Sequence, residues 1–197
     1  MTAQLSNSGT QPAILGVIPA DALSDDMVSL APMLPQDFGL LFGWLNDADA
    51  AAMDVPYLPV SCLAYRDWLE KIARDSSQLL FCVRKRTQPG QAMGFVLFKN
   101  FQNVYRSAEL GVRIGQECER GHGYGARAVR LALSYAWNTL NLHRVSLQVF
   151  ADNQRAVACY RRAGLIQEGL MRDGAFTNGK WRDVALMAAL RPGDPGC

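Results

Sequence analysis

Between positions 119 and 129 the chain reads Glu119-Arg120-Gly121-His122-Gly123-Tyr124-Gly125-Ala126-Arg127-Ala128-Val129. From Tyr124 onward apolar residues recur at helical spacing and polar residues fall on the opposite side, a pattern that predicts an amphipathic helix. The three glycines let the backbone turn its N–H groups toward one point, and the first helical turn adds unpaired donors and the positive end of its dipole. The stretch therefore predicts a loop that holds phosphate.

Other interpretations of this loop compete. Glycines before a helix often serve only a tight turn, and the order Gly121-x-Gly123-x-x-Ala126 also fits the dinucleotide-binding fingerprint, with Asp152 as its acidic partner. The fingerprint matches poorly because a polar segment, residues 116–120, separates the glycines from the preceding strand. A nucleoside-triphosphate P-loop is excluded, since no Lys-Ser or Lys-Thr follows the glycines. A third pattern in the loop is Arg120-x-x-Gly123-x-Gly125. The motifs in the rest of the chain decide between this pattern, the dinucleotide fingerprint and a simple tight turn.

The composition restricts the class of protein. With 197 residues, 49% of them hydrophobic, and a net charge of +2, the chain suits one globular domain with a sizeable core. The near balance of charge argues against a nucleic-acid partner, and no apolar run is long enough to cross a membrane. Residues 1–11 lack the order of a secretion signal. Five scattered cysteines and two histidines without ligand-like spacing predict unpaired thiols, a cytoplasmic location and no metal site.

The periodicities predict one domain over residues 26–192, preceded by a flexible N-terminal extension over 1–25 and followed by a short tail over 193–197. Strand and helix patterns mix within the domain, which indicates the α+β class with a single sheet. A Pro89-Gly90 turn is expected to join two of the strands, and Leu63 is expected to point inward from its helix. The expected strands span 27–32, 79–83, 92–98, 108–114, 143–149, 167–172 and 181–189, and helices are expected from 35, 62, 124 and 153.

Four motifs in this order resemble the GNAT superfamily of acyl-CoA-dependent N-acetyltransferases, most closely its RimJ/RimL branch. The motifs are Ala108-Glu109-Leu110-Gly111-Val112-Arg113-Ile114, the glycine loop, Asn153-x-x-Ala156-x-x-x-Tyr160-x-x-x-Gly164, and Gly179-Lys180-Trp181-Arg182-Asp183. The resemblance covers residues 27–190 and implies the GNAT fold, a single mixed, mostly antiparallel central sheet flanked by helices. It also disfavours the dinucleotide interpretation, because a doubly wound domain needs further strand–helix units after Asp152.

The resemblance implies acetyl-CoA as the cosubstrate, with the glycine loop on its pyrophosphate and the preceding strand on its pantetheine arm. The expected strand contacts are made through the main chain. Asn153 has a second interpretation as an N-cap of the helix that ends at Gly164, which needs no function. The cofactor-binding residues implied in this way are Val112, Ile114, Arg120, Gly121, His122, Gly123, Tyr124, Gly125, Ala126, Asn153 and Tyr160.

Two residues are expected to move protons. The resemblance implies that the Tyr160 hydroxyl protonates the leaving thiolate, although a tyrosine on an inner helix face also serves as core. Glu109 is the candidate base for the acceptor amine, because it lies on the strand face opposite the apolar residues; otherwise it pairs with Arg113 or another cation. Acetyl transfer would then be direct, and a covalent route through Cys159 is the weaker alternative.

The acceptor is expected to be a primary amine of a small molecule: an amino sugar, aminoglycoside, polyamine or amino acid. The alternatives are a protein N-terminus and a non-catalytic acetyl-CoA-binding module. Many relatives that act on protein N-termini have a glutamate where this chain has Gln148, which cannot act as a base. We expect a monomer or homodimer. The candidate acceptor-binding residues are Asp54, Tyr57, Tyr105, Gln148 and Trp181, chosen from loops and strand ends.

Overall fold

The computed structural model describes residues 23–48, 58–74, 77–115 and 117–193. Its centre is a seven-stranded sheet in the order β1-β2-β3-β4-β5-β7-β6, in which only β4 and β5 are parallel neighbours. This arrangement confirms the expected α+β class and the mixed, mostly antiparallel sheet. The elements are β1 Val28–Ala31, α1 Asp37–Leu45, α3 Cys62–Arg74, β2 Leu79–Lys85, β3 Gln88–Gln102, β4 Ser107–Ile114, the 3-10 helix η1 Glu117–Glu119, α4 Tyr124–Asn138, β5 Arg144–Phe150, α5 Gln154–Ala163, β6 Ile166–Thr177 and β7 Lys180–Leu190.

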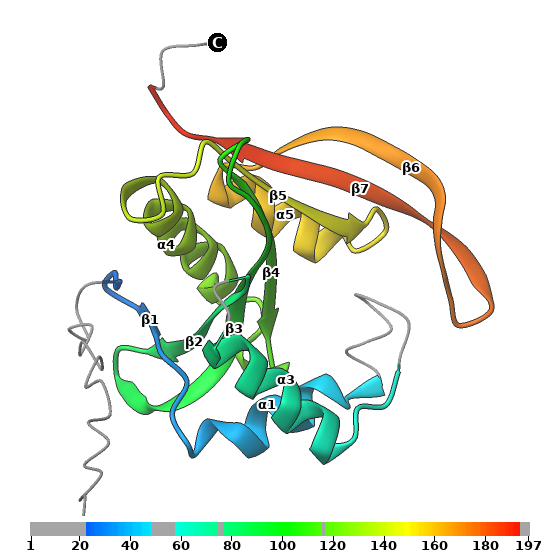
Figure 1. Ribbon diagram of the computed structural model, residues 1–197. Helices are drawn as coiled ribbons and strands as arrows, with labels where there is room; N and C mark the ends of the chain where they lie inside the picture. The colour runs from blue at the N-terminus through cyan, green and yellow to red at the C-terminus, as the bar shows by residue number, and fades with distance from the viewer. Residues whose placement is uncertain (1–22, 49–57, 75–76, 116, 194–197) are drawn as a thin grey trace, which may run out of the picture.

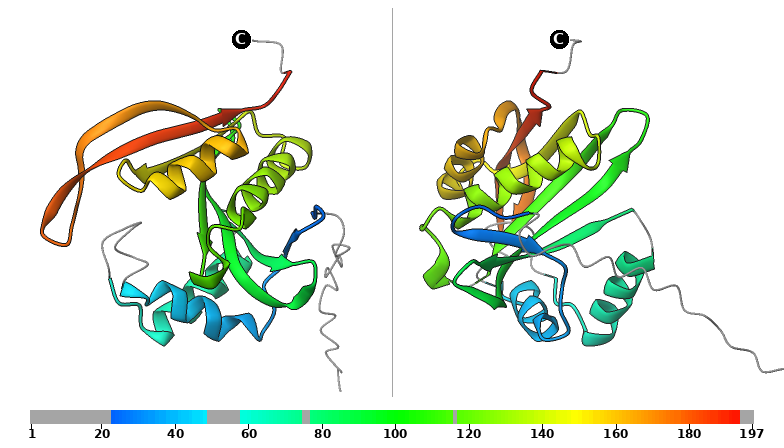
Figure 2. Two further views of the ribbon diagram at one scale, coloured as in Figure 1. Left: turned by 180° about the vertical axis from the view of Figure 1, so that it is seen from behind. Right: turned by 90° about the vertical axis from the view of Figure 1, so that its left-hand side faces the viewer.

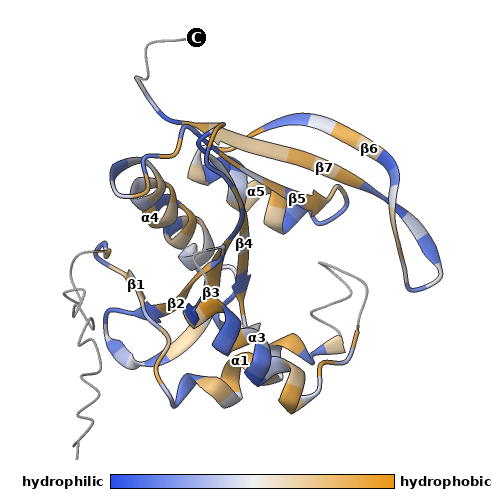
Figure 3. Cartoon of the chain, viewed as in Figure 1, coloured by the Kyte–Doolittle hydropathy of each residue, from blue (hydrophilic) through white to orange (hydrophobic). Residues whose placement is uncertain are grey.

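Helices cover both faces of the sheet (Figures 1 and 2). Successive residues of β2 separate the two layers: Phe81 and Val83 join the core with α4 and α5, whereas Cys82 joins a second core with α1 and α3. On α4 the alanines at 128, 132 and 136 are fully buried, which confirms the predicted inner face of this helix. Figure 3 shows the corresponding apolar colouring along the central strands.

The two halves of the sheet diverge between β4 and β5 (Figure 1). The parallel pairing spans only Ser107–Glu109 of β4 and Arg144–Ser146 of β5. Beyond it, β4 continues along β3 as far as Ile114, while β5 continues along β7 as far as Phe150. The edge of β4 from residue 110 to 114 is therefore turned toward an opening.

Local turn predictions were less accurate than the order of elements. The β2–β3 hairpin turns at Arg86-Thr87, because Lys85 pairs with Gln88, so Pro89-Gly90 belongs to β3 and the predicted turn is wrong. The β6–β7 hairpin turns at Asn178-Gly179, where both residues have positive φ. β6 extends beyond the expected end at residue 172, so Asp173-Gly174 lies within it at a shift of register.

The inner face of α3 also differs from expectation. Leu63 is 69% exposed, and Tyr65 is the residue that is fully buried between α3 and the sheet. Its ring contacts Phe38 and Phe42 of α1, with centroids 4.8 and 5.5 Å away. An aromatic cluster therefore holds α1 to α3.

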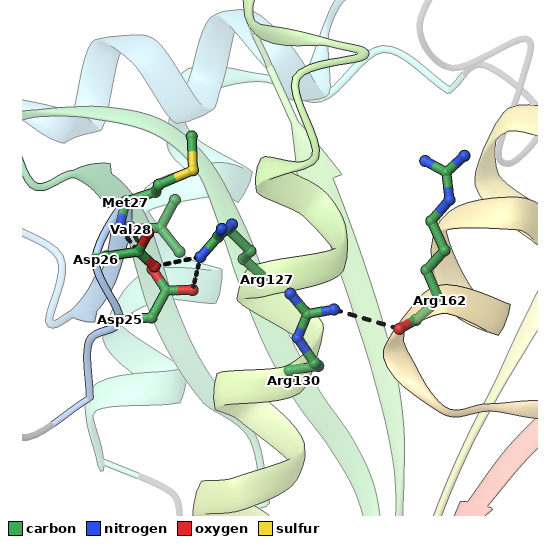
Figure 4. Close-up of polar contacts among 7 residues, drawn as sticks. All are labelled: Asp25, Asp26, Met27, Val28, Arg127, Arg130 and Arg162. Atoms are coloured by element: carbon green, nitrogen blue, oxygen red, sulfur yellow. Dashed lines mark hydrogen bonds and ion pairs between the residues drawn. The ribbon is translucent and has the colours of Figure 1, made fainter.

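The N-terminal end of the described chain packs on α4. The side chain of Leu23 contacts the core, and Asp25 and Asp26 both pair with Arg127 of α4, the first at 2.8 Å (Figure 4). Residues 23–25 therefore belong to the packed domain, and residues 1–22 of the expected extension lie outside the described residues.

A buried ion pair joins α1 to β2. The side chain of Arg84 is 2% exposed and that of Asp37 is fully buried; Arg84 Nη1 donates to Asp37 Oδ1 at 3.2 Å, and Nη2 contacts the other oxygen. Asp37 also accepts the backbone N–H of Leu34 at 2.7 Å. Removing one partner of such a pair leaves an uncompensated charge in the interior.

We therefore predict that Asp37→Ala lowers the free energy of unfolding by about 3–5 kcal/mol in urea denaturation. The matched control is Glu70→Ala, which breaks the exposed Glu70–Arg74 pair, with side chains 54% and 81% exposed, and should change stability by less than about 0.5 kcal/mol. Equal effects of the two substitutions would contradict this account of the Asp37–Arg84 pair.

Candidate active site

A cavity of about 200 Å³ lies at the opening between β4 and β5, beside the start of α4 and the inner side of α5. It brings together every residue that the sequence predicted for the cofactor except His122, whose side chain is exposed beside the Tyr124 ring. The lining also contains residues that the sequence analysis did not choose. The full lining is Val112, Arg113, Ile114, Glu119, Arg120, Gly121, Gly123, Tyr124, Gly125, Ala126, Val149, Asn153, Arg155, Ala156, Cys159, Tyr160 and Arg162.

The glycine loop presents backbone donors to this cavity. Gly121 and Gly123 have φ angles of 90° and 84°, a left-handed conformation that strains any residue with a Cβ. Gly123 is also the N-cap residue of α4. It has no side chain that could accept hydrogen bonds from the backbone N–H groups of the first helical turn. The loop and helix start therefore have a backbone conformation that suits an anion site, the role that the sequence predicts for them.

Arg120, which lines the cavity, also ties the loop to the strand before it. Its guanidinium donates to the carbonyl oxygens of Ile114 and Gly115, each at 3.1 Å, and so holds the loop against the end of β4. A second tie joins Lys85 of β2 to Glu119 at 2.6 Å. These contacts fix the loop from both sides, and the backbone N–H groups are left as its main donors to an anion.

Gly125 lines the cavity and also lies where α4 approaches α5. It lies within α4, and a Cβ built on it would come 3.1 Å from the sulfur of Cys159 on α5. The absence of a side chain therefore permits the close approach of α4 and α5. Burial raises the pKa of the Cys159 thiol, which keeps it protonated at neutral pH and makes it a poor nucleophile.

The carboxyl end of α1 rests on the end of β4. A Cβ at Gly115 would overlap the indole of Trp44, so only glycine permits this contact. Arg113, which lines the cavity, donates to the carbonyl oxygen of Trp44. The cofactor side of the sheet is therefore joined to the helix that leads into residues 49–57, where Asp54 and Tyr57 lie outside the described residues.

Residues of β7 contact the turn that connects β5 to α5 and fix its position. The Arg182 guanidinium lies 4.0 Å from the centre of the Phe150 ring and pairs with both oxygens of Asp152, with Nε at 3.1 Å. The N–H of Ala151 donates to the carbonyl of Asp183 at 2.9 Å. Next to this turn, Asn153 accepts the N–H of Ala156 at 3.2 Å, which confirms its predicted N-cap role at the cavity wall.

The structure does not bring Glu109 and Tyr160 into one cavity. Glu109 faces away from the core of Leu110, as strand alternation predicted, but Lys99 and Asn100 hold its two oxygens at 2.9 and 2.8 Å. Its partner is thus Lys99 rather than Arg113. With Gln148 it lines a second depression.

That second depression is formed by residues of β4, β5, β6 and β7. It also contains Arg144 and Glu168, which form an ion pair, and the Arg144 guanidinium holds the pKa of Glu168 below its usual value. The depression therefore combines carboxylates with cations that already partly neutralise them.

The other acceptor candidates are dispersed. Tyr105 is 74% exposed in the turn that precedes β4, whereas the cavity lies at the far end of that strand. Trp181 is 64% exposed at the start of β7 and packs against Phe176, with ring centroids 5.2 Å apart. Neither residue lines the cofactor cavity in the described part of the chain.

Sequence reasoning missed Arg113, Glu119, Val149, Arg155, Ala156, Cys159 and Arg162 in the cavity wall. For Ala156 a signal was available, because it lies three residues after Asn153 and so shares its side of the helix. For Arg113 and Glu119 none was available, since their positions depend on contacts with α1 and β2.

Two further observations concern the described residues. Among the described residues, no group of three or more His, Cys, Asp or Glu side chains is placed to hold a metal ion. No described helix has both the length and the apolar character needed to cross a membrane.

Comparison with known proteins identifies the family. The family model for the acetyltransferase (GNAT) domain matches residues 28–166, about 70% of the chain. The chain therefore belongs to the GNAT family and is an N-acetyltransferase, and its sheet and helices are those of the GNAT fold.

Particular relatives can be named. Spermidine N(1)-acetyltransferase of Escherichia coli K12 is 32% identical over 166 residues, which cover 83% of this chain and 86% of that protein. The putative ribosomal N-acetyltransferase YdaF of Bacillus subtilis is 33% identical over 102 residues, 52% of this chain and 55% of its own length. The crystal structure of Vibrio cholerae spermidine N-acetyltransferase with CoA and spermine has a TM-score of 0.77 at 24% identity, covers 84% of this chain and 96% of its own, and supports the fold.

We predict that Gly123→Ala weakens acetyl-CoA binding by about tenfold or more in calorimetric titration, because the added methyl stands where phosphate oxygens approach the loop. The control is Gly179→Ala, at a left-handed glycine with φ of 74° and with open space around it in the β6–β7 turn. Both variants carry backbone strain of about 1–2 kcal/mol and should lose similar stability. Affinity should fall only in Gly123→Ala, and unchanged affinity there would contradict the anion-site assignment.

Proposed function

We propose that this protein transfers an acetyl group from acetyl-CoA directly to a primary amine of a polyamine, with spermidine as the best substrate. The choice of acceptor rests on the sequence similarity to E. coli spermidine N(1)-acetyltransferase, which extends over most of both chains. A polyamine also belongs to the class of small amines expected from the sequence.

The residues of the cavity fit the cosubstrate. The backbone of Gly121, Gly123 and the first turn of α4 would hold the pyrophosphate, and the open edge of β4 at Val112 and Ile114 would hold the pantetheine arm through its main-chain groups. When bound, acetyl-CoA supplies the activated acyl group. The pairing pattern supports the second assignment, because β5 no longer occupies this edge of β4.

Tyr160 is the proposed general acid. It lies seven residues after Asn153, two helical turns along the same side of α5, in the wall of the cavity. Its hydroxyl would give a proton to the leaving thiolate, which is basic enough to accept one from a phenol. The raised pKa of Cys159 favours this direct route over a covalent acyl-enzyme.

Glu109 remains the candidate base from the sequence. Its carboxylate is engaged by Lys99 and Asn100 and lies outside the wall of the cofactor cavity, an arrangement that favours a proton path through water over direct contact with the amine. The two carboxylates of the second depression, Glu109 and Glu168, could attract a cationic amine.

A protein N-terminus is the second candidate acceptor. The match to the putative ribosomal enzyme YdaF favours it, as does the RimJ/RimL-like character inferred from the motifs. Gln148, in place of a glutamate, argues against it because an amide cannot take up the amine proton. The expected cytoplasmic location, absence of a metal, and monomeric or dimeric state stay predictions.

The first test combines binding with an acceptor screen. Calorimetry should detect acetyl-CoA binding and no NADH binding, and release of the CoA thiol should be faster with spermidine than with an amino sugar, an aminoglycoside, an amino acid or a peptide. We expect kcat/KM for spermidine to exceed the others by about tenfold or more. If only peptides are acetylated, the acceptor is a protein N-terminus and not a polyamine. If the protein binds NADH and not acetyl-CoA, the proposed cosubstrate is wrong. Acetyl-CoA binding without turnover of any amine would indicate a binding module.

For Tyr160→Phe we predict that kcat falls by about 100-fold while Kd for acetyl-CoA stays within about twofold, because only the proton donor is removed. Tyr135→Phe is the matched control: it removes a phenol oxygen on α4 whose ring packs edge-on to Phe81, away from the cavity. Full turnover in Tyr160→Phe would exclude the general-acid role.

A further inference from the structure

Four arginines line the cofactor cavity, and they divide into two kinds. The guanidinium groups of Arg113 and Arg120 already donate to backbone carbonyl oxygens around the end of β4. Those of Arg155 and Arg162, on α5, have neither a hydrogen bond nor an ion pair within the described residues. Two exposed cations therefore lie at the cavity without a carboxylate to neutralise them.

The two arginines are arranged as a pair. They are seven residues apart on α5, so they lie on the same side of the helix two turns from each other. Arg130 of α4 reaches the same region and donates to the carbonyl oxygen of Arg162 at 3.3 Å (Figure 4). Burial raises the pKa of the Cys159 thiol, whereas the charges of Arg162 and Arg130 act to lower it, so both guanidinium groups lie near this residue of the cavity wall.

CoA carries two separate anionic groups, a pyrophosphate and a phosphate monoester on the 3′ oxygen of the ribose. The glycine loop accounts for one of them, since backbone N–H groups at a helix start suit the pyrophosphate. The monoester carries a charge near −2 at neutral pH, and a guanidinium group binds such a group through two parallel hydrogen bonds. The unneutralised arginines of α5 match this second anion.

We propose that Arg155 and Arg162, with Arg130 beside them, form a second anion subsite that binds the 3′-phosphate of CoA and selects CoA over 3′-dephospho-CoA. The subsite rests on the proposed use of acetyl-CoA. It assigns a role in cosubstrate selection to Arg155 and Arg162 of α5, apart from the proton chemistry assigned to Tyr160.

The test is a calorimetric comparison of CoA and 3′-dephospho-CoA with the full-length protein and three variants, Arg155→Gln, Arg162→Gln and Arg161→Gln. We expect the unchanged protein to bind CoA about tenfold or more tightly than 3′-dephospho-CoA, as one lost charge-assisted contact implies. Arg162→Gln should weaken CoA binding by a similar factor and leave 3′-dephospho-CoA binding unchanged. Arg155→Gln should act in the same direction.

Arg161→Gln is the matched control, because it removes the same charge from the adjacent position. The Arg161 guanidinium donates to Gln167 at 3.2 Å and does not line the cavity, so the preference for CoA should persist in this variant. Equal affinity of the unchanged protein for the two ligands would overturn the subsite alone, as would full preference in both Arg155→Gln and Arg162→Gln. Binding of neither ligand would overturn the proposed cosubstrate and the subsite with it.

Discussion

The short parallel pairing of β4 with β5 is the constraint on which the rest of this structure depends. The two strands share only three residues of register, from Ser107 to Glu109, and then each follows its other neighbour. Because the sheet opens there, a strand edge with backbone donors and acceptors faces a cavity rather than another strand. The glycine loop leaves from the end of β4 and α5 follows the end of β5, so both come to the same opening.

Contacts from distant parts of the chain keep that opening in shape. Arg120 holds the loop to the end of β4, and Arg182 of β7 holds the turn that leads into α5. Arg113 joins β4 to the last turn of α1, and α1 is tied to β2 by the buried Asp37–Arg84 pair. Arginine suits these positions because its planar guanidinium group can make several directed hydrogen bonds at once. The same group can pair with a carboxylate, as Arg84 does with Asp37, or stack on an aromatic ring, as Arg182 does on Phe150.

Local signals made much of the fold and of the cavity wall predictable. The loop before α4, the alternation along β4, and the Asn153 and Gly164 ends of α5 each depend on a few adjacent residues, and the structure has each of these local features. Errors arose where a local rule competed with tertiary contacts. A Pro-Gly pair usually marks a turn, yet the pairing of β2 with β3 moved the turn to Arg86-Thr87. The aromatic cluster around Tyr65 set the inner face of α3 and left Leu63 exposed.

The sequence by itself determined the class of fold, the order of its elements, and the glycine loop and Tyr160 that line one cavity. These follow from periodicity, from glycines and caps, and from motifs whose residues are close together in the chain. Only the tertiary structure decided which charges are neutralised: Glu109 is held by Lys99, and Arg120 by backbone carbonyls, whereas Arg155 and Arg162 keep uncompensated charges at the cavity. The physical reason is that an ion pair or hydrogen bond requires two groups within about 4 Å, and packing between separate elements sets that distance.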